Sequence, residues 1–158
     1  MSTAPFDVGP IIQRLRTRLV VAGGMRLVGN REDFSAVRSL ADFPAPCAYV
    51  LLATEKAVKT DPGQSIPGQQ TDLGQTMRVG VGIAMAFQNY RGLEGDELRD
   101  ELRDRVGQVR NQLLGWTPPA AGAKQMQLDS GDLEDYDANV ALWADKWVTQ
   151  HFIQPEIP

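Results

Sequence analysis

The sequence predicts an α+β fold in which a mixed, mostly antiparallel sheet of about four or five strands packs with two main helices. Two amphipathic helical patterns and several apolar or strictly alternating segments are the observations that predict it. A chain of 158 residues suits one domain, so we expect a single domain over residues 1–158 with a long polar loop at about residues 55–75.

The first helix is expected to start near Asp7, which can cap it, with Pro10 in its first turn. Its apolar side chains recur at helical spacing and form one stripe, made of Val8, Ile11, Ile12, Leu15 and Leu19. The helix should end at Gly23. A short strand over Met25–Val28 and a brief helix over Asp33–Leu40 are expected to follow.

Two strands should form the centre of the sheet. The segment Ala48–Thr54 is apolar on both alternating faces, which is typical of a strand covered on both sides. The polar stretch Glu55–Gln75 then predicts a long loop. In Met77–Phe87 large apolar residues alternate mainly with glycine and alanine, so the strand has one bulky and one small face. The small face would allow close approach of a helix or of a neighbouring subunit.

The second main helix is expected over Leu93–Leu114, where apolar residues lie on one side and Gly115 provides a stop. Two further strands are predicted, near Lys124–Leu128 and over Val140–Ile153. The acidic stretch between them reads as a solvated turn. The helices should cover one face of the sheet.

The sequence predicts no enzyme activity, no cofactor and no metal site. Cys47 is the single cysteine, which excludes an internal disulfide and fits a reducing cytosol, and it reads as an inert core thiol. His151 is the single histidine, and a Cys47–His151 pair stays open as an alternative. The acids of Asp129–Asp137 lack the spacing of a calcium loop. No apolar run is long enough for a membrane helix.

Charge is unevenly distributed along the chain. Residues 1–40 are rich in arginine, whereas Glu94–Asp104 and Asp129–Asp137 are rich in acids. These segments are either ordinary solvated faces or complementary sides that suit head-to-tail association. The net charge of −4 argues against broad neutralisation of nucleic-acid phosphates.

The C-terminal half carries a family resemblance. A helix is followed by the turn Gly115–Pro119 (GWTPP) and then, after the acidic stretch, by a final aromatic strand, WADKWVTQHFI. This order resembles the phage tail terminator, or tail-completion, proteins of long-tailed phages of Mu-like and lambda-like type. The opening PIIQRL, the strand AYVLL and the alternating strand are compatible with it. Structural roles are expected for the motif residues Gly115, Trp116, Pro118, Trp143, Asp145 and Trp147.

The resemblance implies a virion protein without enzymatic chemistry. Six copies would form a ring that caps the tail tube, stops its polymerisation and provides the surface for joining the head. The implied partners are the chain itself, the tail tube protein and a head–tail connector or neck protein, with DNA passing through the lumen unbound. The implied location is the head-proximal end of the tail, after assembly in the host cytoplasm, and no membrane is involved.

Contact with a neighbouring subunit or with the tube is assigned to the polar loop. Its candidate residues are Lys56, Lys59, Gln64, Gln69 and Gln70, although a loop without such a role is the alternative. Other functions stay open as well. The nearest is a neck or head–tail connector adaptor, and a different class is a small cytosolic ligand-binding domain or hydrolase.

Overall fold

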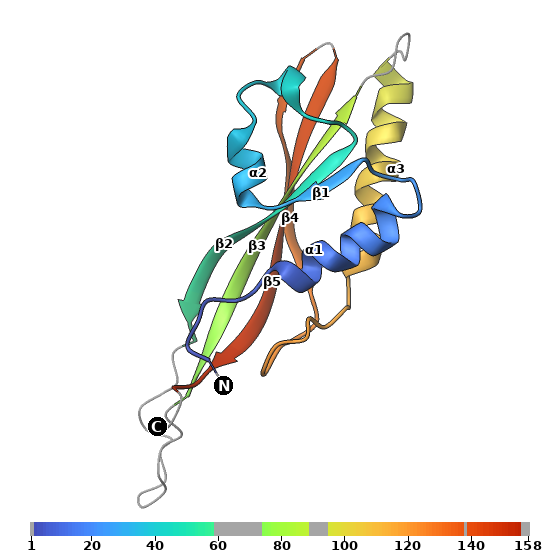
Figure 1. Ribbon diagram of the computed structural model, residues 1–158. Helices are drawn as coiled ribbons and strands as arrows, with labels where there is room; N and C mark the ends of the chain where they lie inside the picture. Colours follow the sequence, from blue (N-terminus) through green and yellow to red (C-terminus); the bar gives the residue numbers. More distant parts are fainter. Residues whose placement is uncertain (1, 59–73, 89–94, 138, 156–158) are drawn as a thin grey trace, which may run out of the picture.

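A computed structural model describes residues 2–58, 74–88, 95–137 and 139–155. Its five strands form one sheet in the order β1-β2-β3-β5-β4, in which β1 and β2 are parallel and all other neighbours are antiparallel (Figure 1). The strands are β1 (Leu27–Gly29), β2 (Cys47–Ala57), β3 (Gln75–Gln88), β4 (Gln127–Tyr136) and β5 (Val140–Ile153). The α+β class and the mixed sheet are therefore confirmed.

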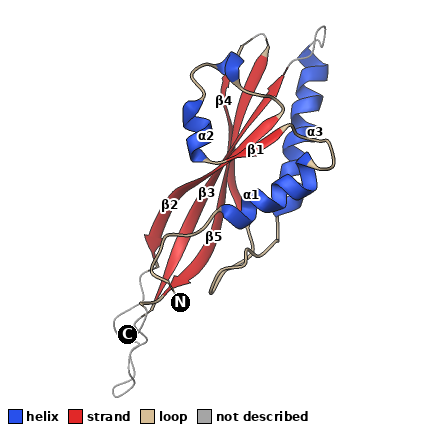
Figure 2. Ribbon diagram, in the orientation of Figure 1, coloured by secondary structure: helices blue, strands red, loops and turns tan. Residues whose placement is uncertain are grey.

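One face of the sheet is covered by the two longer helical segments, α1 (Gly9–Leu15) and α3 (Gly95–Leu113), as Figure 2 shows. A π-helical turn, η1 (Arg16–Val20), continues α1. The predicted apolar stripe is buried here through Ile11, Ile12, Leu15 and Leu19, and it packs with Val106, Val109 and Leu113 of α3. Burial of each such side chain contributes roughly 1.5–3 kcal/mol. This face carries the main core.

Among the described residues, those that cover the opposite face do so over only part of its area. The short helix α2 (Arg31–Ala36) and the 3₁₀ turn η2 (Leu40–Asp42) lie over the half of the sheet nearest Cys47. Phe34 and Phe43 pack on the ring of Tyr49, with ring centroids 5.6 and 5.8 Å from it. The two main helices thus lie on one face as expected, and the cover that α2 and η2 give the opposite face agrees with the expectation that Ala48–Thr54 is covered on both sides.

Side-chain capping sets the start of the second helix but not of the first. Asp7 is not the N-cap of α1, because Val8 occupies that position, and the Asp7 carboxylate instead accepts a hydrogen bond of 2.8 Å from Gly9 N–H. The second helix begins at Arg31 rather than at Asp33. Asn30 and Asp33 form a reciprocal capping box that fixes this start.

The bounds of four strands differ from the expected ones, and β3 starts at Gln75 rather than at Met77. β1 starts at Leu27, two residues later than predicted, and β4 starts at Gln127. The predicted polar loop begins later, because β2 continues to Ala57, and residues 59–73 lie outside the described residues. The predicted acidic turn is largely strand β4, because its backbone pairs with β5 while its acids face solvent. The bounds of β5 are confirmed.

Candidate functional site

The turn after α3 fastens the end of that helix to the start of β4. Gly115 has φ 79°, a conformation that favours glycine, and it closes the helix. Gly115 N–H donates to the carbonyl of Met126 at 3.0 Å, and Met126 N–H donates to the carbonyl of Trp116 at 2.8 Å. Pro118 is buried next to this short ladder. The first half of the motif therefore acts as a brace between helix and sheet.

Trp116 also connects this brace to the first helix. The Arg14 guanidinium lies over the Trp116 ring, 4.9 Å from its centroid. Arg14 Nε donates to the carbonyl of Gln112 at 2.6 Å, near the C-terminal end of α3 where the helix dipole attracts a cation. Arg14 thus joins α1, α3 and the turn in one place.

The second half of the motif surrounds a buried carboxylate. Asp145 of β5 is fully buried and accepts two hydrogen bonds from Arg110 of α3, from Nε at 2.8 Å and from Nη2 at 2.7 Å. Trp143 Nε1 donates a third at 2.8 Å. These hydrogen bonds to Asp145 raise the pKa of Arg110 above its ordinary value, so the guanidinium stays charged. All three hydrogen bonds that Asp145 accepts come from donors within the fold, and the arrangement is a clamp between helix and sheet.

Backbone space around this clamp is tight. A Cβ atom at Gly131 of β4 would lie 2.5 Å from Asp145 Oδ1 and 2.6 Å from Arg110 Nη2. Trp147 is fully buried beside the clamp in the main core. Within the described residues, Trp147 Nε1 is the one buried side-chain nitrogen or oxygen without a hydrogen-bond partner.

A second polar cluster fastens the N-terminal segment to the sheet. The Glu55 carboxylate oxygen Oε1 accepts a hydrogen bond of 2.8 Å from Phe6 N–H and lies 2.6 Å from His151 Nε2. The rings of Phe6 and His151 meet edge to face, with centroids 5.4 Å apart. The single histidine is thus a structural partner of Glu55 at the far end of β5.

The groups with catalytic potential lie apart. Cys47 is opposite Ala86 on β3, whereas His151 is opposite Met77, so nine residues or about 30 Å of strand separate them. Burial raises the pKa of the Cys47 thiol, which disfavours the reactive thiolate. The Cys47–His151 alternative is therefore wrong. The described residues contain no group of three or more side chains suited to a metal ion. No described helix is long and apolar enough to cross a membrane.

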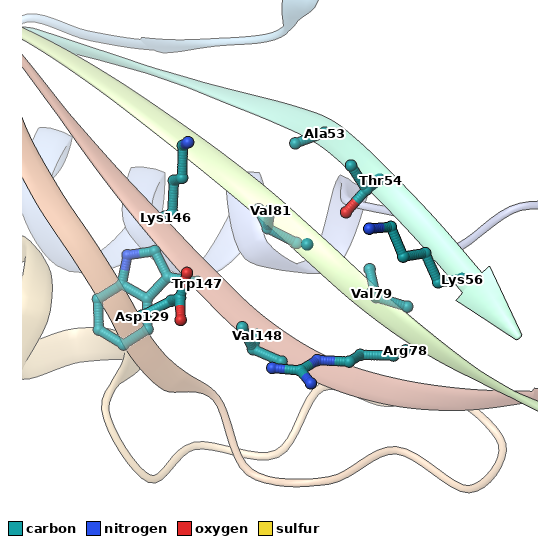
Figure 3. Close-up of a pocket in the computed structure, with 11 residues that line it drawn as sticks. Ala53, Thr54, Lys56, Arg78, Val79, Val81, Asp129, Lys146, Trp147 and Val148 are labelled. Carbon is teal, nitrogen blue, oxygen red and sulfur yellow. The ribbon is translucent and has the colours of Figure 1, made fainter. Parts of the chain in front are cut away.

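The uncovered half of the second face carries a shallow basic depression of about 350 Å³. Lys56 of β2, Arg78 of β3 and Lys146 of β5 are among its lining residues (Figure 3), and all three are exposed. Gly80 is part of the floor, with Gly82 next to it on the same strand. We call Lys56, Arg78, Lys146 and these two glycines the basic face. Asp129 is the one acid among the lining residues.

The strand register places two like charges side by side on the basic face. Lys56 lies directly opposite Arg78, an arrangement that destabilises an antiparallel pair. Within the described part of the chain, none of the three cations forms a hydrogen bond or an ion pair. The face is therefore an electrostatically unsatisfied surface rather than a folding element.

The predicted contact residues are only partly placed. Lys56 is on the basic face, whereas Lys59, Gln64, Gln69 and Gln70 lie outside the described residues. Sequence reasoning missed Arg78 and Lys146. Arg78 occupies the phase of β3 that holds glycine and alanine, and this phase is the signal that could have found it. Lys146 shares its phase of β5 with Leu142 and Val148, so that strand carries no such signal.

Two comparisons with known proteins cover nearly the whole chain. One chain of a solved structure, "Virion of native gene transfer agent (GTA) particle", matches with 13% sequence identity and a TM-score of 0.47, covering 89% of this chain and 90% of that one. No curated protein matches. A sequence model of the family described as "Phage tail terminator protein" matches residues 1–157. The chain therefore belongs to the phage tail terminator family and is a structural protein of a phage virion.

Proposed function

We propose that this protein caps the tail tube as a ring of identical copies, most simply six, stops tube polymerisation and provides the surface to which the head is joined. The family match over residues 1–157 is the observation that carries this proposal. The geometry agrees with it. The polar clusters act as braces within the fold, while the cations of the basic face are exposed and have no partner among the described residues.

The mechanism is steric and cooperative. Each copy uses two different surfaces to contact its two neighbours, and such head-to-tail contacts form a ring when the rotation closes. The ring covers the growing end of the tube, so further tube subunits find no free docking surface. Its other side then presents a repeated surface to a connector or neck protein, and DNA passes through the lumen without specific binding.

Rigid subunits suit this role. A ring that ends polymerisation must hold its copies at one angle, and the clamp between Arg110 and Asp145 fixes α3 on the sheet. Arg14 fixes α1 on α3 in the same way. Function then resides in surfaces held in place by a scaffold, with no reacting group.

Electron microscopy of the purified protein mixed with isolated tail tubes tests the proposal. We expect closed rings at one end of each tube, and tubes that no longer elongate when fresh tube protein is added. Protein bound along the tube wall, or tubes that keep growing, would contradict the capping role. Binding to the connector alone would favour a neck adaptor instead.

A further inference from the structure

The end of the β4–β5 hairpin carries negative charge, which is complementary to the positive charge of the basic face. Glu134 and Asp135 lie near the end of β4 and are exposed, and β4 contains four acids but no lysine or arginine. The only hydrogen bond of either carboxylate within the described residues is a local one of 2.8 Å, from Tyr136 N–H to Asp135. We call Glu134 and Asp135 the acidic hairpin end.

The two surfaces of one copy cannot reach each other. Asp135 is opposite Leu142 on β5, whereas Arg78 is opposite Gln150, and these positions are eight residues or about 27 Å apart along the strand. In addition, α2 and η2 lie over the half of this face nearest Cys47. Charge complementarity between the basic face and the acidic hairpin end can therefore be satisfied only between two molecules.

The free edge of β4 is unsuited to strand addition. Its pairing with β5 shifts register twice, between Leu128 and Ser130 and between Leu133 and Asp135, and acids lie along it. Shifts and charges of this kind protect sheet edges from pairing with another strand. A contact made by this hairpin therefore uses its side chains, not its backbone.

We propose that the acidic hairpin end of one copy docks on the basic face of the next, with Glu134 and Asp135 opposite Lys56 and Arg78. This pairing rests on the proposed ring and names its contact surfaces. The acids of the neighbouring copy offset the repulsion between Lys56 and Arg78, which lie opposite each other. Close approach is possible at Gly82, since its Cβ position has Leu51 O as its nearest atom, at 3.9 Å, whereas Thr54 fills the corresponding space at Gly80. The contact is head-to-tail because its two surfaces differ.

Paired charge reversals test the pairing. Lys56→Glu with Arg78→Glu, and separately Glu134→Lys with Asp135→Lys, should each weaken self-association about tenfold or more, because like charges then face each other. Mixing the two variants should restore rings, in which the two kinds of copy alternate. Arg18→Glu with Arg38→Glu is the matched control for the first pair, since it makes the same change of net charge at exposed positions elsewhere and should leave association unchanged.

A steric variant tests the surface without changing its charge. Gly82→Gln places a long neutral side chain on the open floor and should weaken association about as much as the reversals, with an unchanged melting temperature. Association is measured by sedimentation, with and without tail tubes. Rings formed by the native protein and equally by both reversed variants would overturn this pairing and leave the ring intact. A native chain that forms no oligomer under either condition would overturn both. Loss of DNA binding with unchanged association would assign the face to nucleic acid instead.

Discussion

Arg110 of α3 holds the buried carboxylate of Asp145 in β5 through two hydrogen bonds of 2.8 and 2.7 Å, across 35 residues of sequence. The two partners differ in exposure. The Asp145 side chain has no solvent contact, whereas 34% of the Arg110 side chain remains accessible. Removal of the arginine therefore leaves an unpaired buried charge, while removal of the acid leaves a cation that water can reach.

This asymmetry predicts unequal mutational effects. Arg110→Met should lower the free energy of unfolding by about 3–5 kcal/mol, because it strands the Asp145 carboxylate. Asp145→Asn should lower it by about 1–3 kcal/mol, since the amide oxygen can still accept one hydrogen bond. Urea titration followed by tryptophan fluorescence measures both. Equal effects, or a larger effect of Asp145→Asn, would show that the pair is not a buried clamp of the kind described.

Gly131 should tolerate no side chain, because its Cβ position lies within 2.6 Å of both members of the clamp. Gly131→Ala should reduce stability by about 1–3 kcal/mol through displacement of the Arg110–Asp145 pair. Gly107→Ala is the matched control. It lies in α3 with nothing within 4 Å of the added Cβ, and alanine there should stabilise the helix by about 0.5–1 kcal/mol. Opposite signs for the two alanines in thermal unfolding are the expected result.

Arg14 should contribute more than an ordinary surface arginine. Arg14→Ala removes both the stacking on Trp116 and the hydrogen bond to Gln112, and should lower stability by about 1–2 kcal/mol. Arg18→Ala on the same helical segment should change it by less than about 0.5 kcal/mol, because Arg18 is exposed. If both variants unfold at the same denaturant concentration, the bridge between α1 and α3 has no energetic role.

Glu55 should control the order of the N-terminal segment. Glu55→Ala removes the acceptor for Phe6 N–H and the partner of His151, with an expected loss of about 1–3 kcal/mol. Glu55→Gln keeps one acceptor oxygen and should lose less. Hydrogen exchange at the Phe6 amide measures the effect locally, and faster exchange in the alanine variant is expected. Unchanged protection at this amide would mean that Glu55 does not hold the segment.

The parts of the fold that sequence could predict are those with local periodicity. The stripe of Ile11, Leu15 and Leu19 and the alternation in β3 each report a buried face within one segment. A strand was expected near Lys124–Leu128, but most of β4 was missed because it is an exposed edge strand. Its acids carry the signal of a turn although its backbone pairs with β5. The capping box that sets the start of α2 was also not predicted from the sequence.

Spatial relationships between distant segments were predicted only in part. A partner for the Asp145 carboxylate follows from its place between two tryptophans, but nothing in the sequence identifies that partner as Arg110 on a helix 35 residues earlier. The basic face combines Lys56, Arg78 and Lys146 from three strands. Its composition depends on strand order and register, which the pattern of single strands does not specify.

The tail length distribution of a phage that lacks this chain is the most direct measurement of the central claim. We expect tails of uncontrolled length without attached heads, measured by electron microscopy of lysates, and restoration of one length by the native chain. The capping account further predicts that Arg18→Ala restores the native tail length fully. Arg110→Met should not restore the tail length under conditions in which that variant is unfolded. Tails of normal length that merely lack heads would contradict capping and would favour a neck adaptor.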